Sequence, residues 1–144
     1  MKHEKLTIYS DGGARGNPGP AGIGCVIFDE AGKTASEISE CIGQATNNQA
    51  EYQALLAALK RAHELGASEV DCMMDSELAV RQLNHEYKVR NRELAPLFVK
   101  VWNETIHFKA VRFQHIPRER NKLADSMDNE AIDQALPTGR QALR

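Results

Sequence analysis

The sequence lacks the features that mark secreted, membrane-spanning and disulfide-bonded proteins. Its first residues contain no apolar signal segment, and no run approaches the roughly 20 apolar residues of a membrane span. The cysteines are odd in number, form no CxxC pair and lie in apolar stretches, at Cys25, Cys41 and Cys72. We therefore expect three small buried thiols in a reducing compartment, and a cytoplasmic protein without membrane contact.

Excess positive charge and known nucleotide-binding loops are also missing. The formal net charge is −2, which argues against a protein that holds nucleic acid by bulk charge but leaves room for a local basic face. The stretch from Gly12 to Gly22 fits neither GxxxxGK[ST] nor GxGxxG, which argues against a kinase-like or nucleotide-binding role. The 144 residues suit one globular domain, which we place at residues 1–136, followed by a polar tail at 137–144.

The N-terminal half predicts a three-stranded meander followed by a helix. Strands are expected at residues 6–10, 22–28 and 34–42, with a turn-rich loop over 11–20, and the short connections favour antiparallel pairing. The period then becomes helical, with apolar residues at Tyr52, Leu55, Leu56 and Leu59. Thr46 and Gln49 predict a capping box at the start of this helix, and Gly66 predicts its end.

The C-terminal half alternates strands and helices. We expect a strand at 69–74, a short helix at 76–83, a helix around 94–102, a strand at 110–116 and a last helix at 121–135. The apolar side of the last helix is assigned to Leu123, Ala124, Met127, Ala131 and Ile132. A helix that connects two strands of one sheet makes those strands parallel to each other. The order βββαβααβα therefore predicts an α/β fold: a mixed five-stranded sheet, three strands antiparallel and two added in parallel, flanked by helices.

Four carboxylates are expected to meet at one edge of this sheet. Asp11 and Asp75 follow strands that should be parallel neighbours, so both emerge at the edge where open α/β sheets bind ligands. Glu51 lies in the second turn of the crossover helix, beside its apolar stripe. Asp125 lies in the first turn of the helix that follows the last strand.

A cluster of this kind points to metal-dependent phosphoryl chemistry. Carboxylates in one place repel each other, and multivalent cations relieve the repulsion. Oxygen-only ligands favour Mg²⁺ or Mn²⁺, and two such ions about 3.5–4 Å apart can hold the attacking water and the leaving oxygen of a phosphodiester. Each acid alone also has an ordinary interpretation: a turn residue, a solvated helix acid, a helix cap, or a first-turn acid favoured by the helix dipole.

The placed motifs resemble those of type 1 ribonuclease H. They are YSDGGARGNPGPAG at 9–22, TNNQAE at 46–51, Asp75-Ser76, His115 and NKLAD at 121–125, and they span nearly the whole chain in the family's order. The resemblance implies an RNase H-like fold and an endonuclease that cuts the RNA strand of RNA–DNA hybrids, leaving 5′-phosphate and 3′-hydroxyl ends. It also implies that Asp11, Glu51, Asp75 and Asp125 bind two Mg²⁺ ions when substrate is bound, and that Mn²⁺ can substitute.

The resemblance assigns further residues to catalysis and substrate binding. His115 would assist proton transfer or product release, a role that suits a group titrating near neutral pH. The substrate contacts it implies are Gly12, Gly13, Asn17, Thr46, Asn47, Asn48, Ser76 and Glu77. The start of the helix at Asn47 and Asn48 favours a phosphate. Glu77 stands where the family often has Gln, and a carboxylate can accept but not donate a hydrogen bond to a 2′-hydroxyl.

The chain also departs from longer relatives. It has neither their basic helical protrusion nor a separate hybrid-binding domain, and between Arg81 and Glu93 only three cations, at Lys88, Arg90 and Arg92, could contact the DNA strand. We expect a monomer without an obligatory protein partner. Two alternatives stay open from the sequence: a non-catalytic nucleic-acid-binding module, and a DNA nuclease of the same architecture, since fold alone does not fix substrate.

Overall fold

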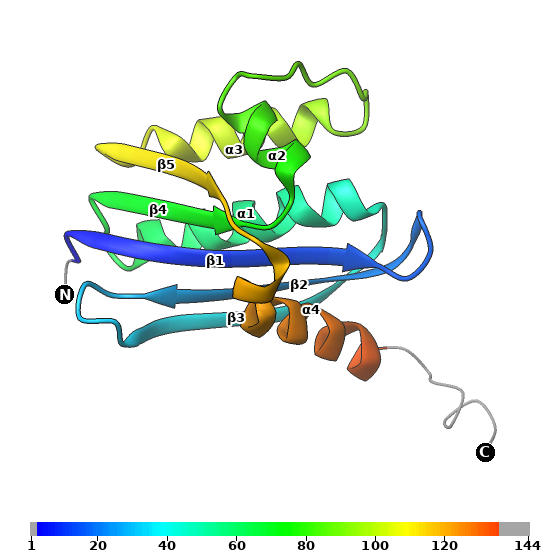
Figure 1. The fold of residues 1–144 in the computed structure, drawn as a ribbon, viewed down its shortest axis with the longest axis horizontal. Coiled ribbons are helices and arrows are strands. Elements are labelled where there is room, and N and C mark those ends of the chain that lie inside the picture. The colour runs from blue at the N-terminus through cyan, green and yellow to red at the C-terminus, as the bar shows by residue number, and fades with distance from the viewer. Residues whose placement is uncertain (1–2, 136–144) are drawn as a thin grey trace.

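The protein, described here from a computed structural model that covers residues 3–135, is built on one mixed sheet (Figure 1). The strands stand in the order β3-β2-β1-β4-β5. β1 is antiparallel to β2 and β2 to β3, whereas β1–β4 and β4–β5 are parallel. The predicted α/β fold class is therefore confirmed. The predicted domain end at residue 136 and the tail at 137–144 lie outside the described residues.

The elements follow the predicted order with one addition. They are β1 (Lys5–Ala14), β2 (Gly19–Phe28), β3 (Thr34–Ala45), α1 (Asn47–Glu64), β4 (Glu69–Met74), α2 (Glu77–Leu83), α3 (Ala95–Thr105), β5 (Ala110–His115), the 3₁₀ turn η1 (Arg118–Arg120) and α4 (Lys122–Ala135). The capping box of Thr46 and Gln49 is present at the start of α1. Gly66, at φ 83°, follows the end of α1 as expected.

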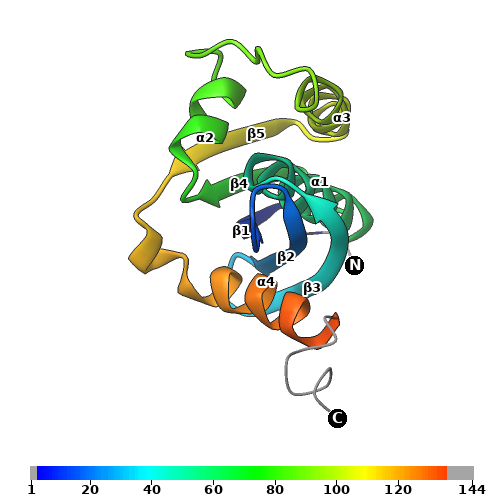
Figure 2. The ribbon, with the colours of Figure 1, turned by 90° about the vertical axis from the view of Figure 1, so that its right-hand side faces the viewer.

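Two layers of helices cover the sheet. α1 packs on β1 and β2 from one side, with α3 beside it, and α4 packs on β2 and β3 from the other (Figures 1 and 2). The core between α1 and the sheet is made of fully buried aliphatic side chains such as Leu6, Ile8, Leu55 and Leu59. Within residues 3–135, no helix has both the length and the apolar character that crossing a membrane requires.

The predicted turn-rich loop over 11–20 is wrong for most of its length. β1 continues to Ala14 and β2 begins at Gly19, so the connection is only four residues long. Gly12 and Gly13 pair with Ile23 and Gly22 in the antiparallel ladder. The glycines serve close packing here: a Cβ on Gly12 would lie 2.1 Å from the carbonyl oxygen of Ala50 in α1. The sequence predicted a loop here because glycine is common in turns, and local sequence preferences contain no information about tertiary packing.

Three smaller expectations also fail. Cys41 is exposed on β3, although Cys25 and Cys72 are buried as predicted. Leu123, assigned to the apolar side of the last helix, is 51% exposed, whereas the next residue, Ala124, is fully buried against the sheet. The third strand also extends past the predicted residue 42 to Ala45, through an irregular register near Gly43, whose φ is 79°.

Close backbone contact also holds α4 to the sheet. A Cβ on Gly24 would lie 2.2 Å from the carbonyl oxygen of Ala124 and 2.7 Å from the backbone nitrogen of Asp128. A Cβ on Gly22 would lie 2.5 Å from the carbonyl oxygen of Asp128. Both glycines belong to β2, so this strand is where the helix meets the sheet with no side chain between them.

We predict that Gly24→Ala lowers the free energy of unfolding by about 1–3 kcal/mol or more, because the added methyl group must displace the backbone of α4. Urea denaturation measures the change. Gly13→Ala is the control, since its Cβ would meet only atoms at 3.7 Å and beyond. Equal stability of the two variants would contradict the close-packing account.

Candidate active site

Asp11 and Asp75 leave a pair of parallel strands side by side. The last register pair between β1 and β4 is Ser10 with Met74, and each acid is the next residue. Asp11 is 6% exposed and Asp75 is half-buried. Asp11 lies within β1 and not at its end as expected, because the strand continues along β2 beyond the point where β4 stops. The predicted juxtaposition of the two acids is nevertheless present.

Glu51 reaches the same place from α1. It is 7% exposed, and its Oε1 accepts a hydrogen bond of 2.7 Å from the backbone nitrogen of Gly12. The bond is possible because Gly12 lets α1 approach β1 at backbone distance. The amide therefore orients the carboxylate of Glu51 toward the strand end, as the sequence predicted when it placed this residue at the border of the sheet.

The start of α4 contributes to the site through Asn121. Its Nδ2 donates to the carbonyl oxygen of Ser10 at 2.9 Å and lies 3.4 Å from Oδ2 of Asp75. Asn121 is 1% exposed, so this link is shielded from water. It ties the first turn of α4, which holds Asp125, to the end of the β1–β4 pair.

The acids form two overlapping groups that share Asp11. In one group, oxygens of Asp11, Glu51 and Asp75 all lie within 4.8 Å of one another. In the other, the same holds for Asp11, Asp125 and Asp128. Together they line a cleft of about 310 Å³. An arrangement of this kind, made only of carboxylate oxygens, offers the ligand chemistry that hard divalent cations prefer.

Burial and mutual repulsion raise the pKa of three of these acids. Burial, followed by contact with Asp128 and the charge of Glu51, raises the pKa of Asp11 far above its usual range. Burial is also the main cause that raises the pKa of Glu51 to about 8, against the opposing hydrogen bond from Gly12. The pKa of Asp128 is raised to about 6, again chiefly by burial. Without a cation, the cluster therefore retains protons at neutral pH.

Only some of the residues expected to bind substrate lie along this cleft. Its lining includes five of them, which are Gly12, Gly13, Asn47, Asn48 and Ser76. Asn17, Thr46, Glu77 and His115 do not line it. Thr46 and Asn17 instead hold the start of α1: the Thr46 hydroxyl accepts from the Gln49 nitrogen at 3.1 Å, and Asn17 Oδ1 accepts from the Asn47 nitrogen at 3.1 Å. These bonds occupy two of the amides at that helix start.

His115 and Glu77 lie just outside the cleft. His115 is exposed at the end of β5, where it pairs in register with Met74, the residue before Asp75. Glu77 is exposed and forms an ion pair with Arg81 at 2.8 Å. Arg118, from η1 after β5, lines the cleft and was not expected. The rim of the site therefore carries the imidazole of His115 and the guanidinium of Arg118.

Asp128 was missed by the sequence interpretation. Its signal was present: position 128 falls at helical spacing between Ala124 and Ile132, inside the stripe predicted to be apolar. An acid on the buried face of a helix needs a partner, and that requirement could have drawn attention to it. In the structure Asp128 is 2% exposed and faces Asp11.

Comparison with known proteins identifies the family. A family model described as reverse transcriptase-like matches residues 9–131. The crystal structure of an RNase H1 from Halobacterium salinarum superimposes with a TM-score of 0.89 at 38% identity, covering 91% of this chain and 99% of that one. The chain belongs to the ribonuclease H family. Its similarity to RNase H1 proteins confirms the type 1 resemblance.

Two further relatives are similar to this chain over most of its length. Bifunctional protein Rv2228c of Mycobacterium tuberculosis is 42% identical over 132 residues, which are 91% of this chain but 36% of that protein. The chain thus spans about a third of the length of that relative. LC11-RNase H1, solved in complex with an RNA/DNA hybrid, is 50% identical with a TM-score of 0.86, over 90% of this chain and 98% of that one.

The raised pKa values predict how stability depends on pH in metal-free protein. The folded state holds the Glu51 proton more tightly than the unfolded chain does, so wild type loses stability as pH rises from about 5 to about 8. Glu51→Gln carries no such proton. In EDTA, the free energy of unfolding of Glu51→Gln minus that of wild type should therefore rise by more than ~1 kcal/mol between about pH 5 and about pH 8.

The control for this comparison is Glu64→Gln, on the same helix, whose side chain is 71% exposed. Its difference from wild type should not change with pH. Urea denaturation at each pH measures both. A constant difference for Glu51→Gln would show that its carboxylate is not buried in the way the structure describes.

Proposed function

We propose that this ribonuclease H is an endonuclease that hydrolyses the RNA strand of RNA–DNA hybrids with two divalent cations, largely independently of sequence, leaving 5′-phosphate and 3′-hydroxyl ends. The observation that carries the proposal is the convergence of Asp11, Glu51, Asp75 and Asp125 on one cleft, from β1, α1, the end of β4 and α4 respectively. The hybrid complex of the 50% identical LC11-RNase H1 supports the choice of substrate.

The donor set fits a pair of Mg²⁺ ions, with Mn²⁺ as a substitute. All the donors are carboxylate oxygens. Burial, followed by contact with Asp128 and the charge of Glu51, raises the pKa of Asp11 strongly, and a bound cation would offset that cost. Asp11 belongs to both groups of acids, so it would help to hold both ions. When bound, such ions activate a water molecule, polarise the scissile phosphate and stabilise the leaving oxygen.

The residues around the acids hold them in position before any ion arrives. The Gly12 amide orients Glu51, and Asn121 keeps Asp75 next to the β1–β4 edge. The Asn47 Oδ1 accepts from the Ala14 nitrogen at 2.8 Å, which fixes the glycine-containing end of β1 against the start of α1. Pre-organisation of this kind limits the reorganisation needed in the transition state.

Substrate recognition is assigned to the rim of the cleft. Asn47, Asn48 and Ser76 line it and offer polar groups to the RNA backbone. Contacts to 2′-hydroxyl groups in the wide minor groove would distinguish RNA from DNA. To accept such a hydrogen bond, Glu77 must break its ion pair with Arg81 or use its second carboxylate oxygen. Breaking the pair costs little free energy because both side chains are at the surface. His115, on the adjacent strand end, would donate a proton to the departing 3′-oxygen.

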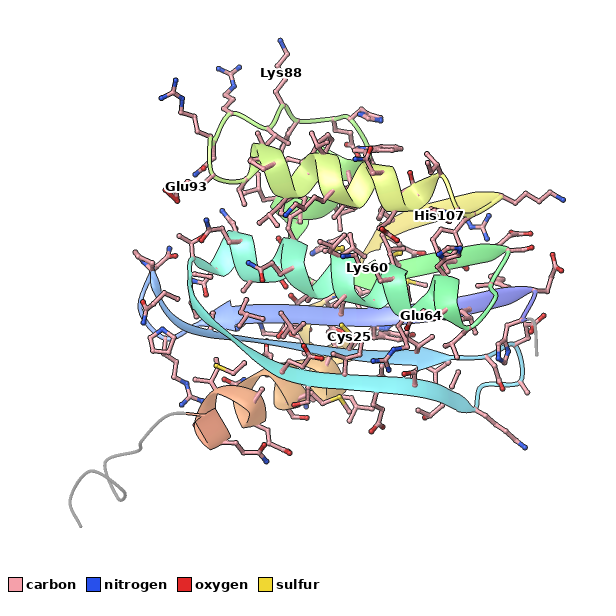
Figure 3. All side chains as sticks on the ribbon, turned by 180° about the vertical axis from the view of Figure 1, so that it is seen from behind. Cys25, Lys60, Glu64, Lys88, Glu93 and His107 are labelled. Carbon is pink, nitrogen blue, oxygen red and sulfur yellow. The ribbon has the colours of Figure 1, made fainter. Side chains whose placement is uncertain are left out.

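We predict that Glu51→Gln and Asp75→Asn each lower the rate of hybrid cleavage by about 10³-fold or more, because each removes a charge from the metal site. The matched control is again Glu64→Gln, which lies at the far end of α1 from the cleft (Figure 3) and should cleave like wild type. The assay follows an end-labelled RNA–DNA hybrid with Mg²⁺, with Mn²⁺ and with chelator.

The same assay includes DNA duplex, RNA duplex and single-stranded RNA. Cleavage of only the RNA strand of the hybrid, dependent on metal, is the expected result. Hybrid binding without any cleavage by wild type would indicate a non-catalytic binding module. Cleavage of DNA duplex would indicate a DNA nuclease of the same fold.

The loop between α2 and α3 should add affinity for the DNA strand. Lys88, Arg90 and Arg92 are exposed on it, and Lys88 points away from the body of the protein (Figure 3). Changing all three to Ala should raise KM, leave kcat unchanged and reduce the salt slope of hybrid binding by about 2–3 units, because each phosphate contact releases about one counterion. Lys60→Ala, an exposed cation on α1, is the control. A slope unchanged by the triple substitution would contradict this role.

A further inference from the structure

Asp128 is a buried acid for which the proposed reaction has no use. It lies on α4, three residues after Asp125, and is 2% exposed. Its Oδ1 has no hydrogen-bond partner among the described residues. The nearby guanidinium of Arg15 pairs with Asp133 and contacts the carbonyl oxygen of Asn129. A buried carboxylate oxygen without a partner is costly, and therefore indicates a missing ligand.

We propose that Asp128 is a fifth carboxylate of the metal centre, and that with Asp11 and Asp125 it holds one divalent cation before substrate binds. The inference rests on the proposed metal centre and adds to it. The other cation would lie with Asp11, Glu51 and Asp75. Both positions would then have three protein carboxylates, so neither would need a substrate phosphate to retain its ion.

The distances suit one cation for each group. Six oxygens around Mg²⁺, each about 2.1 Å from the ion, lie about 3–4.2 Å from one another. One oxygen from each of Asp11, Asp125 and Asp128 lies within 4.8 Å of the other two. Small side-chain rotations therefore close the group around an ion. Asp125 and Asp128 lie three apart on α4 and so project from the same face of that helix.

The helix backbone at Asp128 packs directly against the sheet. Gly22 and Gly24 of β2 leave no room for even a methyl group between the sheet and this turn of α4. Gly24 is also the register partner of Asp11, and paired residues face the same side of a sheet. The Ser39 hydroxyl donates to the Met127 carbonyl oxygen at 2.7 Å and adds a further anchor from β3. The carboxylate of Asp128 is thus held over Asp11.

The structure also defines the competing explanation. Asp11 and Asp128 contact each other through their carboxyl groups, and a single shared proton would satisfy that contact without any metal. In that case Asp128 would be a structural partner of Asp11 and would not bind a cation. The two explanations differ in the number of ions that the protein binds when no nucleic acid is present.

Mn²⁺ titration of metal-free protein, by calorimetry and by electron paramagnetic resonance, distinguishes them. We expect wild type to bind two Mn²⁺ ions without nucleic acid. Asp128→Asn should keep one site and bind the second ion about tenfold more weakly or worse. Glu130→Gln, an exposed acid two residues further along α4, should bind like wild type. Thermal unfolding in EDTA checks that each variant is folded.

Two results would overturn the proposal: a single Mn²⁺ bound by wild type, or unchanged number and affinity in Asp128→Asn. The first needs no variant, so the test holds even if the substitution impairs folding. Failure of the proposed function has a different signature, because wild type would then bind Mn²⁺ but cleave no hybrid. Cleavage by wild type together with unchanged Mn²⁺ binding in Asp128→Asn would leave the function standing and remove only the role of Asp128.

Discussion

The approach of two helices to one strand pair, at a distance only glycine permits, is the constraint on which the site depends. Gly12 of β1 admits α1, and Gly22 and Gly24 of β2 admit α4 from the opposite face. Side chains on a strand alternate between faces, so neighbouring residues of β1 serve both helices. Asp11 lies between them and is reached by acids from both sides. A larger residue at any of these glycines would separate the carboxylates as it separated the layers.

The same geometry concentrates carboxylates in a small, largely buried space. Asp11, Glu51 and Asp128 are each more than nine-tenths buried, and their pKa values are raised. Such a cluster costs stability unless protons or cations occupy it. This cost is consistent with a binding site, because a divalent cation that binds there relieves the repulsion between the carboxylates, and the relief adds to its binding free energy. The fold therefore sets where a cation would bind and favours an ion of high charge.

Much of this could be predicted from the sequence, and the reasons are physical. Helical periodicity located α1 and its buried face, and the parallel crossovers placed Asp11 beside Asp75. The errors arose where tertiary contact decides local structure. The glycines after Asp11 were assigned to a loop, although they are strand residues under a helix. Asp128 was overlooked although its helical spacing put it in the predicted apolar stripe, and the depth of its burial depends on how closely α4 meets β2. Cys41 and Leu123 were misjudged for a similar reason, since their exposure follows from which part of each element is covered.

Anomalous diffraction from crystals grown with Mn²⁺ and an uncleavable RNA–DNA hybrid tests the central claim most directly, namely that this acidic cleft is a metal centre acting on RNA. The account predicts two anomalous peaks about 3.5–4 Å apart, with Asp11 between them and a phosphate of the RNA strand against both. Peaks elsewhere, or a hybrid bound with its RNA strand away from the cleft, would contradict it.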